Sequence, residues 1–219
     1  SGDGRYVGLI ETVSEWFSYH SSAYYKIFNR SDGTEYKTIE VPDAEILNIK
    51  QTQMNRNGSK IASFEYPGLF PDDDVSLVIC DVQKEETVKI PITLFRDERM
   101  IWLDERYLAV ASKEAVYVGA ANAAYRIGVY DTDGGEWRWS KTGEHILGED
   151  LRIVKRTYDD GRDTIVVMSG SSVLGFDSET GELCVNAIGS GAALLPIMKN
   201  YGGGAIFCSD GSLLIAAES

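Results

Sequence analysis

Phe176-Asp177-Ser178-Glu179-Thr180-Gly181-Glu182 is a polar turn between two short apolar stretches. Val173 and Leu174 precede this turn, and Leu183 and Val185 resume the apolar alternation after it. Glycine adopts turn conformations that other residues avoid, so its place at the end of such a segment favours a tight reversal. The stretch therefore predicts a β-hairpin.

The same hairpin pattern occurs three more times upstream, over Tyr25–Val41, Leu77–Ile90 and Ile127–Trp139. Each copy has a strand-like stretch, a polar turn that opens with Asn or Asp, and a second strand-like stretch. The first turn residues lie 52, 50 and 46 residues apart: Asn29, Asp81, Asp131 and Asp177. A unit that repeats at roughly 40–50 residues indicates a propeller or a solenoid.

A second family of polar turns alternates with the first, and each member leads into a strand. Its members are Asp3–Val7, Asn57–Ile61, Asp104–Leu108, Asp160–Thr164 and, more loosely, Tyr201–Ala205. Each unit thus reads strand A, turn, strand B, loop, strand C, turn, strand D. The sequence predicts one all-β domain over residues 1–219, a β-propeller-type array of four-stranded antiparallel blades with about four blades and a partial fifth. The units span about 1–43, 44–96, 97–145, 146–190 and 191–219; a generic β-sandwich is the alternative fold.

Strand A of the first unit and strand D of the last have no counterpart in the sequence. We therefore expect the chain to be part of a longer protein. It would form either an arc or a ring that another segment or a second copy completes. Open blade edges expose unpaired backbone groups, which makes self-association possible.

The composition excludes several classes of partner. Lys and Arg total 21 against 34 Asp and Glu, a net charge of −13, which argues against binding to nucleic acid or to an anionic membrane. No stretch of about 18 apolar residues is present, so we expect no membrane insertion.

We expect a soluble domain on the extracytoplasmic side of the cell. The cysteines lie in apolar strand patterns, and we do not expect a Cys184–Cys208 disulfide.

Residues that could carry catalysis are sparse. The two histidines, His20 and His145, have no nucleophile motif beside them. The acidic segments Pro71–Asp74 and Asp131–Glu136 could bind a hard cation, but the second lacks the distal Glu of a calcium loop and both fit polar turns better. We predict no catalytic residue, no metal and no cofactor.

The strongest candidate binding site is a group of aromatic residues around one long loop. Units one to three carry B–C loops of about ten residues, and loops on a rigid scaffold often bind ligands. In the first of these, Ser14–Ser22, and just after it, the residues that could stack on a sugar or anchor a protein are Trp16, Phe17, Tyr19, His20 and Tyr24. Tyr25 follows directly in the sequence and completes the aromatic group. The alternative is that half of this group of six packs between blades.

The segment Val166–Leu183 resembles the repeat of pyrroloquinoline-quinone-type β-propellers, which has a strand, a Gly/Ser turn, a strand ending in Asp, then Thr-Gly and a closing tryptophan. Asp131–Trp139 matches with the tryptophan in place, whereas Asp177–Val185 has valine there. The resemblance implies the propeller fold. The quinone enzymes of this superfamily use larger rings of blades than this chain could build. The resemblance therefore implies no cofactor-binding residue here.

Two classes of function remain. The first is a non-enzymatic binding or scaffold module, the sensor or ectodomain portion of a longer protein, which recognises a protein or glycan through its B–C loops. The second is the accessory propeller of an enzyme, either a hydrolase or a quinone-type dehydrogenase. The scarcity of histidine and the absence of a nucleophile motif favour the first class.

Overall fold

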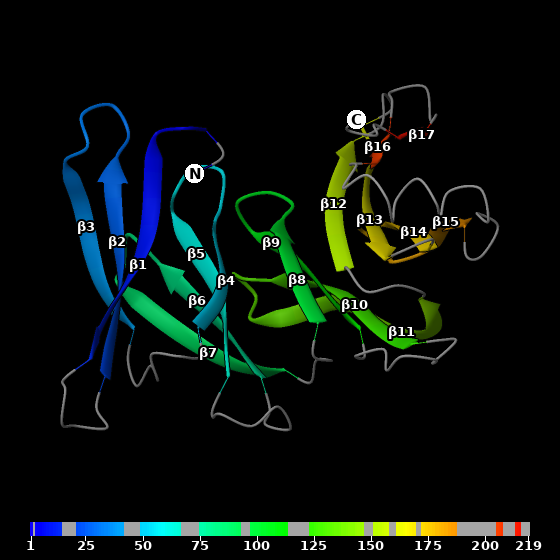
Figure 1. The fold of residues 1–219 in the computed structure, drawn as a ribbon, viewed down its shortest axis with the longest axis horizontal. Helices are drawn as coiled ribbons and strands as arrows, with labels where there is room; N and C mark the ends of the chain where they lie inside the picture. The colour runs from blue at the N-terminus through cyan, green and yellow to red at the C-terminus, as the bar shows by residue number, and fades with distance from the viewer. Residues whose placement is uncertain are drawn as a thin grey trace. The chain divides into compact units, whose positions relative to one another are not determined.

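The computed structural model describes residues 1, 3–14, 21–41, 49–66, 75–92, 97–113, 123–146, 151–157, 161–169, 172–187, 205–207 and 213–215. Strands and turns make up this part of the chain (Figure 1). The sheets follow one another along the sequence, and within each sheet the strands that are consecutive in the chain are hydrogen-bonded to each other. The predicted all-β fold with four-stranded antiparallel sheets is confirmed.

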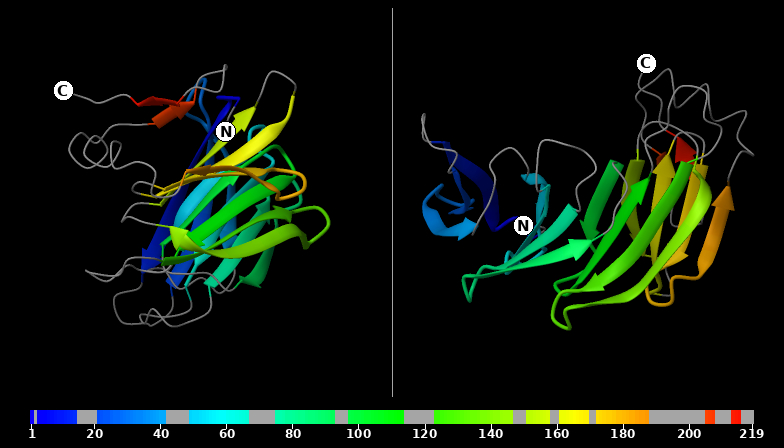
Figure 2. Two further views of the ribbon diagram at one scale, coloured as in Figure 1. Left: turned by 90° about the vertical axis from the view of Figure 1, so that its right-hand side faces the viewer. Right: turned by 90° about the horizontal axis from the view of Figure 1, so that it is seen from below.

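The first sheet contains β1 (Tyr6–Ser14), β2 (Ser21–Asn29) and β3 (Glu35–Val41). The second contains β4 (Ile49–Met54), β5 (Lys60–Glu65), β6 (Val75–Asp81) and β7 (Glu86–Ile92). The third contains β8 (Asp97–Trp102), β9 (Tyr107–Lys113), β10 (Ala123–Asp131) and β11 (Glu136–Ile146), seen side by side in Figure 2. The fourth contains β12 (Leu151–Thr157), β13 (Asp163–Ser169), β14 (Ser172–Asp177) and β15 (Leu183–Ala187). A two-stranded fifth sheet contains β16 (Ala205–Phe207) and β17 (Leu213–Ile215).

The B strands form the buried centre of the complete sheets. From its second residue onward, every residue of β5, β9 and β13 is buried, which is the pattern of a strand covered on both faces. The D strand β7 instead has mostly exposed and half-buried residues. Burial therefore concentrates in the middle of each sheet and decreases toward the D edge.

The C–D turns share one hydrogen-bond geometry in all four large sheets. The amide of the fifth turn residue donates to the carbonyl of the first, as from Gly181 to Asp177 at 2.9 Å. The other three such bonds are Gly33 to Asn29 at 2.8 Å, Glu85 to Asp81 at 2.9 Å and Gly135 to Asp131 at 2.9 Å. The fifth residue has positive φ in every copy, which explains why three of the four are glycine.

An aspartate carboxylate closes three of these turns from the inside. Asp177 Oδ1 accepts the amides of Glu179 and Thr180, at 2.9 and 2.8 Å. Asp81 and Asp131 make the matching pair of bonds to the second and third residues after them. Local hydrogen bonding of this kind is the reason that Asp recurs at the anchor position.

The A–B turns that precede β1 and β5 are also equivalent. The Gly58 amide donates to the Asn55 carbonyl at 3.2 Å, and the Gly4 amide donates to the Ser1 carbonyl at 3.1 Å. The nitrogen of Asn55 donates to Lys60 O at 3.0 Å, and that of Ser1 donates to Tyr6 O at 2.7 Å. Both glycines have positive φ. Tyr6 in β1 therefore corresponds to Lys60 in β5.

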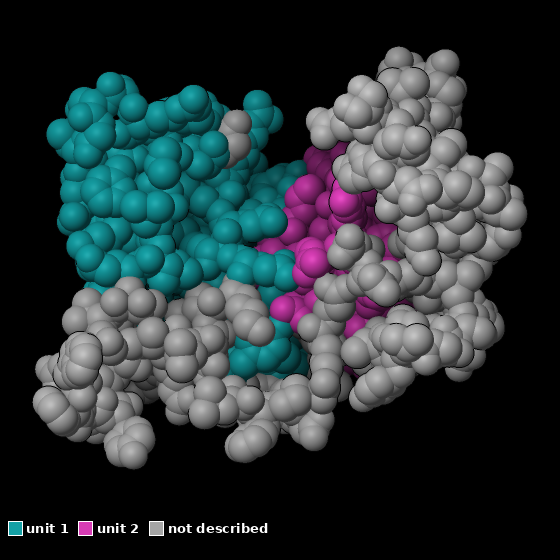
Figure 3. All heavy atoms as spheres, viewed as in Figure 1, with its two compact units in different colours: residues 1–94, 102–107 teal, residues 95–101, 108–219 magenta. Residues whose placement is uncertain are grey.

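The chain divides into two compact units, coloured separately in Figure 3. Unit 1 comprises residues 1–94 and 102–107, and unit 2 comprises 95–101 and 108–219. The A–B turn of the third sheet thus belongs to unit 1. Two hydrogen bonds hold it there: Trp102 Nε1 donates to Gln53 O at 3.2 Å, and Asn55 Nδ2 donates to Glu105 O at 3.3 Å.

The core of unit 1 lies between the first and second sheets. Tyr25 on β2 is 1% exposed, and its hydroxyl hydrogen-bonds to Ser63 on β5. The cluster contains Ala23, Tyr25, Ile27, Ile39 and Val41 of the first sheet, and Ile61, Val78, Cys80 and Val82 from the second sheet and its turn.

In unit 2, Trp139 links the third and fourth sheets. Its Nε1 donates to Ser178 O at 3.0 Å, and its ring centroid lies 6.3 Å from that of Phe176. A Cβ added at Gly181 would lie 2.7 Å from Trp139 Cδ2. The closing tryptophan of the repeat therefore packs on the C–D turn of the following sheet.

Candidate binding surface

Tyr24 is the one residue of the predicted aromatic site that the structure describes; Trp16, Phe17, Tyr19 and His20 lie outside the described residues. Tyr24 is half-buried on β2, and it pairs with Glu11 on β1 and Glu40 on β3. Its neighbour Tyr25 points into the core of unit 1. The alternative that part of the aromatic group packs between sheets therefore holds for Tyr25.

The strand register places Tyr24 on the side of the first sheet that faces away from this core. Directly opposed residues of antiparallel strands point to the same face. Val7 pairs with Phe28, and Leu9 pairs with Lys26. We call the set Val7, Leu9, Glu11, Tyr24, Lys26 and Phe28 the outer face.

The outer face exposes apolar side chains at positions that are buried in the second sheet. Counting from the equivalent turns, Val7 corresponds to Ile61 and Leu9 corresponds to Ser63. Val7 and Leu9 are 44% and 57% exposed, whereas Ile61 and Ser63 are 2% and 0% exposed. The face that covers a core in the second sheet is open to solvent in the first.

The outer face also carries charge where the second sheet is apolar. Counting from Asn29 and Asp81, Lys26 corresponds to Val78, which is fully buried. Lys26 Nζ lies 2.7 Å from Glu11 Oε2, and this bond to Glu11 raises the pKa of the lysine. The side chains of Lys26 and Glu11 are 29% and 47% exposed, so both charges stay in contact with water. The outer face thus has apolar residues at the Val7–Phe28 end and a charged pair beside them, a mixture that also occurs in interfaces between soluble partners.

Sequence reasoning did not identify Val7 or Leu9. Both follow the alternation of a buried strand, and the exposure of a strand depends on what packs against it. The signal that could have found the outer face is the difference between equivalent units, since lysine stands at position 26 where valine stands at position 78.

The predicted turn at Asp131–Glu136 is confirmed, because Asp131 Oδ1 accepts the amides of Asp133 and Gly134 at 3.0 Å each. Among the described residues, no group of three or more His, Cys, Asp and Glu is arranged to hold a metal ion. Pro71–Asp74 lies outside the described residues, as does the side chain of His145.

The two described cysteines are free thiols, and they differ in environment. Cys80 is buried, and burial raises the pKa of its thiol to about 11, which suppresses the reactive thiolate. Cys184 is exposed, and Cys208 lies outside the described residues. In the described part of the chain, no helix is long and apolar enough to span a membrane.

Comparison with known proteins identifies the fold. No family model matches the chain, and no curated protein matches it. Among solved structures, acylaminoacyl peptidase from Pyrococcus horikoshii superposes with a TM-score of 0.53 at 15% identity, over 92% of this chain and 32% of the peptidase. The β-propeller domain of the Trilobed protease from Pyrococcus furiosus superposes with a TM-score of 0.53 at 14% identity, over 84% of this chain and 55% of that one.

The chain therefore spans about a third of the length of the peptidase and about half of the length of the β-propeller domain of the protease. The likeness assigns the array of antiparallel sheets to the β-propeller fold.

Proposed function

We propose that the chain is a non-enzymatic binding module that recognises a protein partner through the outer face and the adjoining B–C loop. The observation that carries this proposal is the exposure of Val7 and Leu9, whose counterparts in the second sheet are buried. An exposed apolar patch with polar residues around it is typical of a protein interaction site. Tyr24 extends the patch toward the loop that contains Trp16.

The composition of the outer face is consistent with transient binding of a partner. Burial of a leucine or valine side chain contributes roughly 1.5–3 kcal/mol, so a few such contacts support a modest affinity. The Lys26–Glu11 pair lies beside them and would orient the partner more than it would strengthen binding.

To test the proposal, ligands that bind the intact chain are selected from a display library of protein domains. Leu9→Ser should weaken binding of a selected ligand by roughly ten- to a hundredfold. Val88→Ser is the matched control, because Val88 is 56% exposed against 57% for Leu9 and lies on β7, away from the outer face. Thermal denaturation should change little in either variant, since both side chains are exposed.

A selected ligand that binds Leu9→Ser and the unaltered chain equally would contradict the proposal. A glycan array extends the same test to sugars, because stacked aromatic rings also hold carbohydrate. If a glycan binds, Trp16→Ala should abolish binding while the thermal midpoint stays unchanged.

A second candidate is the accessory propeller of an enzyme. Its support is that both solved structures reported above belong to proteases. Under this alternative, the outer face contacts a catalytic domain of the same protein. Leu9→Ser would then change hydrolase activity of the full-length protein and would leave binding of separate domains unaffected.

We also propose that the repeats are of the pyrroloquinoline-quinone type and hold no cofactor. The support is the repeat motif at Asp131–Trp139, with the tryptophan at its end.

A further inference from the structure

The side chain of Lys37 on β3 reaches the C–D turn of the second sheet. Its Nζ donates to Val82 O at 2.7 Å and to Gln83 O at 3.4 Å, and it lies 3.0 Å from Glu85 Oε1. An ammonium group has three N–H donors, and these three oxygens belong to one turn. Lys37 therefore connects the first sheet to the second at this turn.

Lys37 occupies the position in its sheet that Trp139 occupies in the third sheet. Lys37 pairs with Ile27, and Trp139 pairs with Val129. Each partner lies two residues before the start of its C–D turn, and a register shift follows it in both sheets. The two side chains thus leave equivalent points of their D strands.

Both side chains donate to the equivalent atom of the C–D turn in the next sheet. Trp139 Nε1 donates to Ser178 O at 3.0 Å, and Lys37 Nζ donates to Val82 O at 2.7 Å. Each acceptor is the second residue of its turn. An indole N–H in unit 2 and an ammonium in unit 1 therefore close the same kind of contact.

The fifth residue of the turn differs with the donor. A Cβ added at Gly181 would lie 2.7 Å from Trp139 Cδ2, so the ring needs glycine there. The corresponding residue beside Lys37 is Glu85, which has a φ of +60° although this region favours glycine. The glutamate gains its ion pair with the lysine. The residues thus form matched pairs, Trp with Gly and Lys with Glu.

The two pairs differ in their dependence on charge. The side chains of Lys37 and Glu85 are 23% and 61% exposed, so dissolved salt screens this pair. Trp139 and its acceptor carry no net charge, and salt weakens such a contact much less. The two turns should therefore respond differently to ionic strength.

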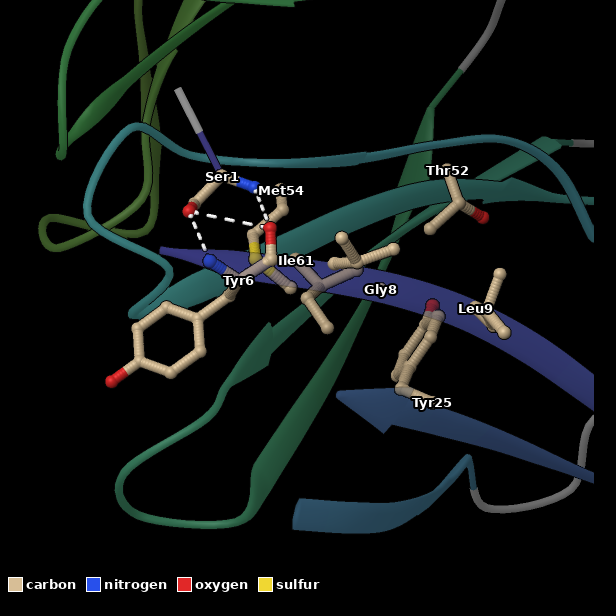
Figure 4. Close-up of a pocket in the computed structure, with 9 residues that line it drawn as sticks. Ser1, Tyr6, Gly8, Leu9, Tyr25, Thr52, Met54 and Ile61 are labelled. Carbon is tan, nitrogen blue, oxygen red and sulfur yellow. Dashed lines mark hydrogen bonds between the residues drawn. The ribbon is translucent and has the colours of Figure 1, made fainter. Parts of the chain in front are cut away.

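The apolar packing of unit 1 does not depend on this charge. The core between the first and second sheets consists of aliphatic residues, Cys80 and Tyr25. Figure 4 shows Tyr25 and Ile61 beside a pocket of about 300 Å³, whose lining includes neither Lys37 nor Glu85. Loss of the ion pair would therefore free the turn and leave the sheets packed.

We propose that Lys37 and Glu85 form a latch that holds the second C–D turn to the first sheet at low ionic strength and loosens as the ionic strength rises. The turn then opens locally while the core stays closed. The corresponding turn of the fourth sheet, held by Trp139, stays in place. This device is independent of the partner proposed for the outer face, since Lys37 is not part of that face.

Amide hydrogen exchange of the intact chain, followed by NMR, tests the latch. The reporter is the Glu85 amide, which donates to Asp81 O at 2.9 Å, and the internal control is the Gly181 amide, which donates to Asp177 O at 2.9 Å. Between about 0.01 M and about 1 M NaCl, the Debye length falls from about 30 Å to about 3 Å. Protection of Glu85 should fall about two- to fivefold, the effect of losing an exposed ion pair, while protection of Gly181 changes by less than about 1.5-fold.

Lys37→Met tests the lysine itself. Methionine keeps an apolar stem but cannot donate, so Glu85 protection at low salt should fall by about tenfold or more, and its salt dependence should disappear. Lys26→Met is the matched control, because Lys26 is 29% exposed and forms an ion pair of 2.7 Å with Glu11. Both residues of that pair belong to the first sheet, so Glu85 protection should stay unchanged.

An exchange of the pair tests the correspondence with Trp139. Lys37→Trp alone should lower the protection of Glu85, because the glutamate side chain occupies the place that the ring needs. Addition of Glu85→Gly should restore protection at this position and make it insensitive to salt. Such a recovery is a coupling between the two sites, which independent substitutions would not show.

Three results would overturn the proposal. The first is an equal response of Glu85 and Gly181 to salt. The second is a salt dependence of Glu85 that persists in Lys37→Met. The third is a double variant with no more protection than Lys37→Trp. A salt response that is confined to the second turn and requires Lys37 supports the proposal.

Discussion

The contact between Trp139 and Gly181 combines two constraints at one residue. Gly181 has a φ of +70°, and the tryptophan ring lies against the place where a side chain would be. Gly135 occupies the same turn position with a φ of +72°, and nothing lies within 4 Å of a Cβ added there. Substitution at Gly135 therefore measures the free-energy cost of a side chain at positive φ alone. Substitution at Gly181 adds the cost of steric overlap with the tryptophan ring.

Gly135→Ala should lower the free energy of unfolding by about 1–2 kcal/mol, the cost of a side chain in the left-handed region. Gly181→Ala should lower it by that amount plus about 1–3 kcal/mol of overpacking against Trp139. Urea denaturation of the two variants measures the difference. Equal losses would show that the tryptophan ring moves aside without cost.

At the scale of single residues, the sequence predicts the features that depend on hydrogen bonds between residues close in the chain. Asp177 and Gly181 were identifiable because their partners lie within five residues. The exposure of Val7 was not, because Ile61 shows the same alternation and is buried. Whether a strand face is covered depends on contacts distant in sequence, which one sequence does not reveal.

At the scale of elements, the C–D turn depends on an ionised carboxylate. Bonds from the Thr180 and Glu179 amides hold the pKa of Asp177 below its usual range. A carboxyl whose pKa is lower in the folded state stabilises the fold above the ordinary Asp pKa of about 3.9. That contribution is lost as the pH falls through the lower, folded-state value.

Asp177→Ala should therefore cost about 1 kcal/mol at neutral pH, the usual loss when a side chain that accepts backbone amides is removed. The difference between the two proteins should shrink as the pH falls below about 4. Denaturation at pH 7 and pH 3 tests the sign. Asp177→Asn keeps an acceptor oxygen without charge, so it should lose less at pH 7 than Asp177→Ala.

The bounds of the third sheet show where strand prediction stops. The apolar run of this strand extends from Met100 to Leu103, but β8 begins at Asp97 and ends at Trp102. Glu98 is 3% exposed, and a buried glutamate is not expected from a polarity pattern. The Leu103 amide bonds to Tyr107 O at 2.9 Å, so this residue closes the turn and does not extend the strand.

At the scale of the whole molecule, the division into two units cuts through the third repeat. The period of the turns predicted the array of sheets, because each turn is encoded locally. It did not predict that residues 102–107 belong to unit 1. That assignment depends on Trp102 and Asn55, whose partners are about 50 residues away.

Weakening unit 1 should therefore loosen a segment that lies between two parts of unit 2 in sequence. Ile27→Val removes one methylene from the core of unit 1 and should cost about 0.5–1.5 kcal/mol. Hydrogen exchange should then accelerate over residues 102–107 and stay unchanged over β13. If β13 and residues 102–107 accelerate equally, the two units open together.

The turn that leads into β5 has a consequence for chemical ageing. An Asn-Gly pair deamidates when the backbone nitrogen of the glycine attacks the side-chain carbonyl carbon of the asparagine and ammonia leaves. Hydrolysis of the succinimide that forms gives aspartate or isoaspartate. In the Asn57-Gly58 pair, the glycine amide donates to Asn55 O at 3.2 Å and the asparagine Oδ1 accepts from the Ser59 amide at 2.9 Å. Both reacting groups are engaged elsewhere while the hairpin is closed. Isoaspartate at position 57 in stored protein would thus record the time that this hairpin has spent open.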